Sequence, residues 1–286
     1  MNNLVRLSIA ILVSLLFASS LALAVITYDV ESREEAIRIF NRDAFGLQTA
    51  DISTLDLSNL TLTNGNISYA VAGGTNFSNT NLSGTDFQST YLTNANLLSA
   101  DVSGVNFSNA SLEGADARRA NFSNATLVDV NLSDAALSRA NFTGATFERV
   151  VGTLRASNAT FDNATMTGQH FFPKSNFSRA SFRGTDMSNS WFMVGKFANA
   201  ELNGANLHGA KLVGANFSGA DLTSVNLTGA FVMDADFSNA DLSNANLSLA
   251  NFKGANLTSA VLNGAQINFT IRPDGAACND VDCLRG

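Results

Sequence analysis

Residues 205–219 read Ala205-Asn206-Leu207-His208-Gly209-Ala210-Lys211-Leu212-Val213-Gly214-Ala215-Asn216-Phe217-Ser218-Gly219. A large apolar residue returns at every fifth position of this stretch, and an alanine stands two residues before each one. A period of five matches neither the 3.6-residue period of an α-helix nor the two-residue period of a β-strand. The stretch therefore predicts a repeat structure rather than an ordinary helix or sheet.

The same period extends over most of the chain. From Ile52 to Ile267, nearly every fifth residue is Leu, Phe, Ile, Val or Met; Asn or Asp usually precedes it, and Ser or Thr usually follows it. Apolar residues that lie two positions apart point to the same side of a short extended segment, and the Asn or Asp between them points outward. Ser, Thr, Gly and Asn at the last two positions are typical of turns. Each pentapeptide is thus predicted to form one short side and one corner of a coil.

This pattern, A-(D/N)-(L/F)-x-x, resembles the pentapeptide-repeat family over residues 50–267. The resemblance implies an all-β fold, a right-handed quadrilateral β-helix that stacks about eleven coils of four pentapeptides each. Residues 20 apart would then lie directly above one another. Two internal ladders of aromatic rings are predicted on this basis, one from Phe87 and Phe107 and the other from Phe177, Phe197, Phe217 and Phe237.

The period falters within residues 150–175. Phe161 and Met166 stand one position earlier than the period requires, and the original phase has returned by Phe177. One residue has therefore been lost before Phe161 and one gained across residues 170–174. We interpret the irregularity as a bulge that the coil tolerates, with a bent or protruding binding site as the alternative.

The N-terminus has the features of a secretory signal. Arg6 precedes an apolar run from Leu7 to Phe17, and small residues lead on to Ala22-Leu23-Ala24. We predict that residues 1–24 are a signal peptide that is cleaved after Ala24. An uncleaved segment that tethers the protein to a membrane is the alternative.

Both ends of the repeat have candidate covers. The N-terminal segment, residues 25–49, is expected to contain a helix over residues 29–46 that begins with the capping-box sequence Ser32-Arg33-Glu34-Glu35 and covers the edge of the first coil. The tail, residues 268–286, carries the two cysteines of the chain, Cys278 and Cys283. In an exported protein these cysteines predict a short disulfide, and a metal site is the alternative.

A basic belt interrupts a chain that is acidic overall. The formal net charge is -7, yet bases outnumber acids between Arg118 and Lys196. Arg119, Arg139 and Arg179 occupy the same position of the repeat and are predicted to lie in one column. Trp191 is expected to face outward near the basic belt. Stacked like charges favour an anionic partner. The candidate partner-binding face therefore consists of Arg118, Arg119, Arg139, Arg179 and Trp191.

Apart from the metal-site alternative for the two tail cysteines, nothing in the sequence indicates an enzyme, a cofactor or a metal site. Asp and Asn exchange freely at the position before each core residue, which paired catalytic carboxylates would not tolerate. His170 and His208 have no neighbours at metal-ligand spacing. A net-acidic chain is a poor candidate for binding nucleic acid, and no motif indicates a small-molecule substrate.

We therefore expect a monomeric, non-catalytic scaffold or protein-binding module, with an unknown protein partner, in the periplasm or the thylakoid lumen. The chain is similar in this respect to exported pentapeptide-repeat proteins of cyanobacteria and chloroplasts. The resemblance also offers an alternative, a DNA mimic that occupies the DNA site of gyrase and inhibits or protects that topoisomerase. A polysaccharide-cleaving enzyme, the third hypothesis, is disfavoured because the tight corners of a four-sided coil leave little groove.

Overall fold

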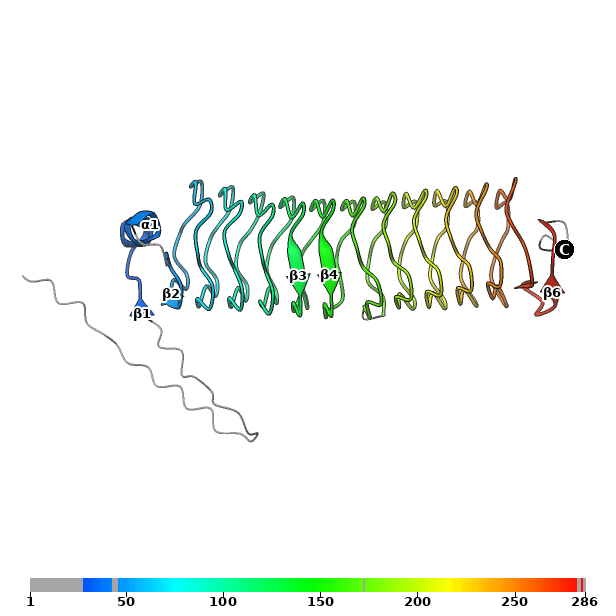
Figure 1. The fold of residues 1–286 in the computed structure, drawn as a ribbon, viewed down its shortest axis with the longest axis horizontal. Helices are drawn as coiled ribbons and strands as arrows, with labels where there is room; N and C mark the ends of the chain where they lie inside the picture. Colours follow the sequence, from blue (N-terminus) through cyan, green and yellow to red (C-terminus); the bar gives the residue numbers. More distant parts are fainter. Residues whose placement is uncertain (1–27, 43–45, 172, 282–283, 285–286) are drawn as a thin grey trace, which may run out of the picture.

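The protein is a solenoid whose coils stack along one axis into a rod (Figure 1). The structure, a computed structural model, describes residues 28–42, 46–171, 173–281 and 284. Its named elements are short: β1 (Tyr28–Asp29), α1 (Arg33–Arg42), β2 (Ala50–Asp51), β3 (Thr126–Val128), β4 (Thr146–Glu148), β5 (Thr270–Ile271) and β6 (Ala277–Cys278). β1 pairs with β2 and β3 with β4, both in parallel, whereas β5 and β6 pair in antiparallel orientation.

Single parallel bridges, rather than long strands, join each coil to the next. Asp51 pairs with Val71 and Asp56 with Asn76, and Thr61 and Asn66 pair in the same way with residues 20 positions later. Four such bridges fall within each 20 residues, so each coil has four sides. The five-residue period is thus confirmed as one side and one corner of a four-sided parallel β-helix.

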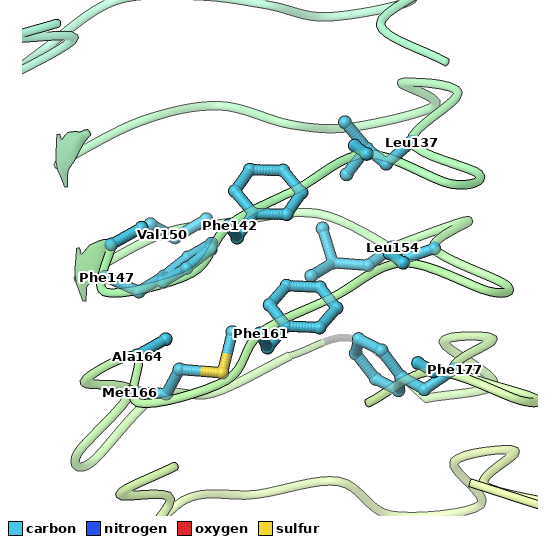
Figure 2. Close-up of a cluster of buried hydrophobic side chains, with 14 of the residues drawn as sticks. Leu137, Phe142, Phe147, Val150, Leu154, Phe161, Ala164, Met166 and Phe177 are labelled. Atoms are coloured by element: carbon cyan, nitrogen blue, oxygen red, sulfur yellow. The ribbon is translucent and has the colours of Figure 1, made fainter. Parts of the chain in front are cut away.

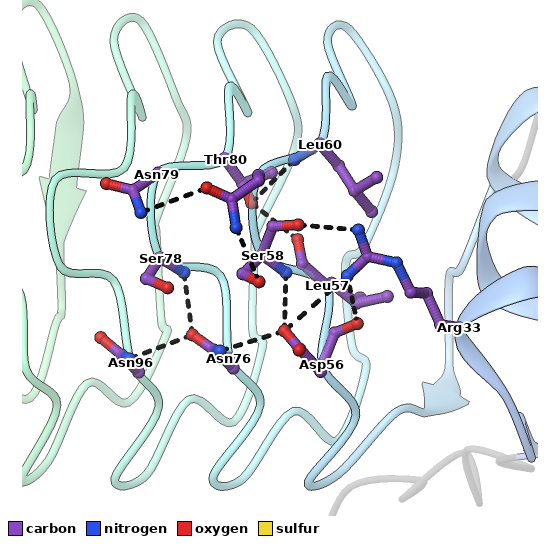
Figure 3. A network of polar contacts seen from close by, with 11 residues as sticks. Arg33, Asp56, Leu57, Ser58, Leu60, Asn76, Ser78, Asn79, Thr80 and Asn96 are labelled. Atoms are coloured by element: carbon purple, nitrogen blue, oxygen red, sulfur yellow. Dashed lines mark hydrogen bonds and ion pairs between the residues drawn. The ribbon is translucent and has the colours of Figure 1, made fainter.

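The Asn or Asp of each repeat holds the corner that follows it. The backbone N–H of Ser78 donates to the side-chain oxygen of Asn76 at 3.1 Å, and the side-chain NH2 of Asn76 donates to the carboxylate of Asp56 in the preceding coil at 3.0 Å. Asn96 continues this ladder by donating to Asn76 at 3.0 Å (Figure 3). An acceptor oxygen is what the corner requires, and Asn and Asp both supply one. Their exchange along the chain therefore has a structural cause.

The interior contains the predicted ladders of phenylalanine rings. Ring centroids lie 5.0 Å apart between Phe177 and Phe197, and 4.8 Å and 5.1 Å apart along the next two steps to Phe217 and Phe237. The predicted stack of Phe87 on Phe107 is also present, at 5.2 Å. These offset and parallel contacts add to the stabilisation from burying the rings.

The break in the period changes the spacing between coils. Ala136 pairs with Arg155, 19 residues later, and Arg155 pairs with Asn176, 21 residues later, after which the spacing returns to 20. The predicted loss and gain of one residue are therefore confirmed. The core continues through this region, because Phe161 stacks on Phe142 at 5.0 Å and lies among other buried apolar side chains (Figure 2).

Two side chains replace backbone partners at the break. The Gln169 carboxamide, which is only 3% exposed, accepts a hydrogen bond from the N–H of Val150 at 3.1 Å. The Ser175 hydroxyl accepts one from the N–H of Leu154 at 3.0 Å. Within the described part of the chain, every buried polar side-chain atom has a hydrogen-bond partner. This arrangement supports the interpretation of the irregularity as a tolerated bulge.

The N-terminal helix is shorter than the sequence predicted. It begins at Arg33 rather than residue 29, because Tyr28–Asp29 form β1 and pair with β2. Its last residue is Arg42, and residues 43–45 lie outside the described ranges. The Ser32 hydroxyl accepts the N–H of Glu35 at 3.1 Å as predicted, but the Glu35 carboxylate accepts the N–H of Glu31, not that of Ser32.

Arg33 connects this helix to the edge of the first coil. Its guanidinium donates to the backbone carbonyl of Asp56 at 2.7 Å and to that of Ser58 at 2.8 Å (Figure 3). One coil later, the equivalent carbonyls of Asn76 and Ser78 accept backbone N–H groups from the preceding coil. The two terminal nitrogens of this guanidinium thus take the place of the backbone donors that a preceding coil would supply, and they cover part of an exposed β edge.

At the other end of the rod, the β5–β6 hairpin follows the last coil, and Cys278 is buried there. Cys283 lies outside the described residues, so the Cys278–Cys283 disulfide stays a prediction. The predicted signal peptide, residues 1–24, also lies outside them. Within the described ranges, no helical segment has the length and apolar character that a bilayer crossing requires.

Replacing Arg33 with methionine is expected to lower the free energy of unfolding by about 1 to 2 kcal/mol, because two edge carbonyls lose charged donors. Denaturant unfolding would measure this free energy, and amide hydrogen exchange would show whether the loss of protection is in the first coil. Arg38→Met is the matched control, since Arg38 contacts Glu35 of the same helix at 3.5 Å and is mostly exposed. Its effect should stay below about 0.5 kcal/mol. Equal effects of both changes would contradict the edge role of Arg33.

Candidate protein-binding face

The three predicted arginines lie at one corner of the rod. The backbone N–H of Arg119 donates to the carbonyl of Ser138, and that of Arg139 donates to Ser157, so these residues are neighbours in successive coils. The column continues through Asn158, which follows Ser157, and reaches Arg179 one coil later. The predicted column is therefore confirmed, with Asn158 between its second and third arginines. We call Arg119, Arg139 and Arg179 the arginine corner.

Each residue of the arginine corner has a left-handed backbone. Their φ angles are 61°, 64° and 58°. Most corners elsewhere in the rod place Gly or Asn in this conformation, for example Gly219 and Asn199 of the same column. This left-handed conformation is disfavoured for any residue that has a Cβ, and Asn adopts the conformation more readily than Arg does. The arginines therefore cost the fold stability at these positions.

The arginine corner is not neutralised by acids of the chain. In the described residues, no Asp or Glu lies within ion-pair distance of Arg119, Arg139 or Arg179. Other arginines of the basic belt do have partners: Arg149 contacts Asp129, Arg155 contacts Asp134, and Arg183 contacts Glu201. The arginine corner is thus a site of uncompensated positive charge on an acidic chain.

Arg118 belongs to the same corner but differs from the three arginines. Its guanidinium donates two hydrogen bonds to the Asp116 carboxylate, at 2.8 Å and 2.6 Å. These hydrogen bonds hold the pKa of the Asp116 carboxyl below its ordinary value. Arg118 therefore contributes a neutral ion pair rather than a free charge to the predicted face.

A groove of about 500 Å³ follows this corner. Its lining comes from four successive coils and combines guanidinium groups with smaller polar groups and one leucine. The polar lining residues are not among the site residues predicted from the sequence, although their place next to the arginine position of each repeat is a signal that could have identified them. The lining residues are Leu98, Arg118, Arg119, Ser138, Arg139, Ser157 and Asn158.

Trp191 does not join the arginine corner. It lies in another column, between His170 of the preceding coil and Lys211 of the following one. The imidazole of His170 stacks on the indole at 4.1 Å between ring centroids, and the Lys211 ammonium lies 3.8 Å from the indole centroid. These contacts come from the coils on either side of Trp191, one from an aromatic ring and one from a cation. Trp191 therefore lies apart from the arginine corner, although the candidate face had grouped the two.

Within the described ranges, no three His, Cys, Asp or Glu side chains gather closely enough to hold a metal ion. A second pocket, of about 580 Å³, lies at the C-terminal end of the rod and is lined in part by Leu257, Leu284 and the Arg272–Asp274 pair. The arginine corner is the part of the predicted face that the structure assembles.

Replacing any one residue of the arginine corner with asparagine is expected to raise the free energy of unfolding by about 0.5 to 1 kcal/mol, because asparagine relieves the left-handed backbone. Denaturant unfolding of Arg119→Asn, Arg139→Asn and Arg179→Asn would measure this. Arg149→Asn is the control: its φ is 50°, but it also holds Asp129 at 2.7 Å, so its gain should be smaller. Destabilisation by all three corner variants would contradict the argument.

Comparisons with known proteins agree with the repeat. The family model for pentapeptide repeats matches residues 73–109, 106–144, 200–239 and 235–268. A comparison with curated proteins gave no match.

Solved structures with similarity to the chain include other pentapeptide-repeat proteins. HetL, which is involved in heterocyst differentiation regulation in the cyanobacterium Nostoc sp. strain PCC 7120, is 26% identical; the match covers 87% of this chain and 100% of HetL, with a TM-score of 0.33. A protein from the Arabidopsis thaliana thylakoid lumen is 24% identical over 41% of this chain and 65% of its own, with a TM-score of 0.18. QnrB1, a plasmid-mediated fluoroquinolone resistance protein, is 19% identical over 74% of this chain and 92% of its own, with a TM-score of 0.32.

The resemblance inferred from the sequence rested on one feature, the five-residue period. The structure converts that period into a four-sided parallel coil, and the family model matches the repeats on both sides of the irregular region. The chain belongs to the pentapeptide-repeat family, whose repeats imply a right-handed quadrilateral β-helix.

Proposed function

We propose that the protein is a non-catalytic scaffold that binds an anionic protein partner through the arginine corner. One observation carries this proposal: three arginines that have no acidic partner among the described residues lie in one column, in strained backbone positions, on a chain whose net charge is -7. Their mutual repulsion and their backbone strain both destabilise the free rod. An anionic partner would remove the repulsion and so gain affinity from it.

The stacked coils support a binding role because they fix the positions of the charges. The corner is built from turns that are hydrogen-bonded to both neighbouring coils, so its backbone needs no ordering when a partner arrives. Less conformational entropy is then lost on association. The long arginine side chains remain adaptable at a rigid base.

We further propose that the protein works in an oxidising compartment, the periplasm or the thylakoid lumen. The signal-like N-terminus and the cysteine pair at the C-terminal end support export. The proposed working form is a monomer, because α1 packs at one end of the rod and a tail follows the last coil at the other (Figure 1).

A DNA mimic that binds gyrase is the second candidate. One observation favours it: Glu201, Asp221 and Asp241 stack in consecutive coils and form an acidic column on a rod of net charge -7. Two observations weigh against it, since the arginine corner interrupts the acidic surface and the N-terminus favours export. The two candidates therefore differ in both compartment and active surface.

The intact mass of the protein isolated from its own cells should distinguish these compartments. We expect a mass that lacks residues 1–24 and also the pair of hydrogen atoms that disulfide formation removes, because export exposes the chain to signal cleavage and oxidation. Reduction should restore the hydrogen atoms. A full-length mass with both thiols free would overturn the export proposal and favour the DNA mimic.

Capture of native partners should depend on the arginine corner. The triple variant Arg119→Asn/Arg139→Asn/Arg179→Asn removes three positive charges and keeps a residue type that the repeat uses at these corners. We expect this variant to capture at least about tenfold less partner from the protein's own compartment than the wild-type rod does, which corresponds to roughly 1.4 kcal/mol of binding free energy. Arg149→Asn, at another corner, is the control. Equal capture by the wild type and the triple variant would contradict the proposed function.

A further inference from the structure

The groove beside the arginine corner has a shape and chemistry that identify its occupant more closely. We infer that it holds an extended acidic peptide segment of the partner, which runs along the rod axis and places carboxylates against Arg119 and Arg139. This inference rests on the proposed protein-binding function and specifies the ligand of the same site.

The direction and length of the groove fit an extended chain. Its lining residues come from four successive coils at one corner, from Leu98 to Asn158, so the groove follows the axis of the rod rather than crossing it. Stacked coils lie about 4.8 Å apart, and an extended strand rises about 3.3 Å per residue. The groove therefore accommodates about four or five residues of an extended peptide.

The positions of the charges fit alternate residues of such a peptide. Arg119 and Arg139 lie in adjacent coils, and neither has an acidic partner among the described residues. Side chains on one face of a strand are about 6.6 Å apart, a spacing that two long arginine side chains can reach from bases about 4.8 Å apart. Guanidinium forks match carboxylates in geometry and charge. Two acidic residues separated by one other residue are thus the preferred pattern.

The remaining lining residues favour a peptide over a nucleic acid. Ser138, Ser157 and Asn158 offer donors and acceptors for the backbone of a peptide, and Leu98 offers an apolar contact at one end. None of the described residues that line the groove is aromatic, whereas single-stranded nucleic acid is held largely by stacking on aromatic rings. The acidic remainder of the rod would also repel a polyanion.

Asp116 limits the positive charge of the groove. Its carboxylate holds the Arg118 guanidinium through two hydrogen bonds, and its Oδ1 also accepts the backbone N–H of Arg118. Asp116→Asn would keep an oxygen at the turn but remove the ion pair. Arg118 would then become available to the ligand, so this change is expected to strengthen binding.

Fluorescence anisotropy with a labelled five-residue peptide would test the inference. The probe carries leucine first and glutamate at its second and fourth positions, with serine elsewhere; its glutamine counterpart is the uncharged control. We expect the glutamate peptide to bind the wild-type rod at least tenfold more tightly than the glutamine peptide. Arg119→Asn/Arg139→Asn should weaken binding tenfold or more, Arg149→Asn should change it less than twofold, and Asp116→Asn should strengthen it severalfold.

Several results would overturn the inference. They are equal binding of the two peptides, an effect of Arg149→Asn as large as that of the corner variant, and tighter binding of a labelled single-stranded oligonucleotide at the same corner. Circular dichroism and melting of each variant would verify that the rod is folded. If native partner capture depends on the arginine corner while the glutamate peptide does not bind, the peptide inference fails and the proposed function stands.

Discussion

Parallel hydrogen bonds between successive coils govern the whole rod. The N–H of Phe197 donates to the carbonyl of Asn216 in the next coil at 2.7 Å, and the N–H of Lys196 donates back to Ser175 in the previous one at 2.9 Å. Because these bonds fix one register, each side chain has a counterpart of the same orientation above and below it. The interior ladder of phenylalanines, the outer ladder of asparagines and the column of arginines are three consequences of that register.

Where the register cannot continue, side chains supply the missing partners. Arg33 donates to the carbonyls of the first coil, which has no preceding coil to bond them. Gln169 and Ser175 accept backbone N–H groups where one residue has been lost and another gained. Unpaired backbone groups are costly when they are buried, so these substitutions explain how the solenoid tolerates both an end and a break. A change of coil length at one side therefore leaves the stack on either side of it intact.

The five-residue spacing predicted a repeating coil and located the lost and gained residues. Together with the four-sided coil that the resemblance to the pentapeptide-repeat family implied, it also predicted the phenylalanine ladders and the arginine column, because a fixed register converts sequence separation into position. It did not predict features that depend on which side chains meet. The pairing of Tyr28–Asp29 with β2 shortens the helix, Asp116 neutralises Arg118, and His170 covers Trp191. The last contact joins residues 21 apart, across the irregular region, where the regular period no longer identifies neighbours. Long side chains have several rotamers, and a repeat pattern specifies none of them.

Outward positions of the repeat can vary without disturbing the hydrogen bonds between coils. A residue at such a position is therefore informative about function mainly when it destabilises the fold. An arginine in the left-handed corner is costly in backbone energy, and two in adjacent coils also repel each other. Elsewhere in the belt acids of the chain offset such charges, as Asp129 does for Arg149. At the arginine corner no described residue does so, which points to compensation from outside the chain. The coil rise sets the spacing of these charges, so selectivity would arise from a match between that rise and the spacing of carboxylates along a partner chain, rather than from a deep pocket.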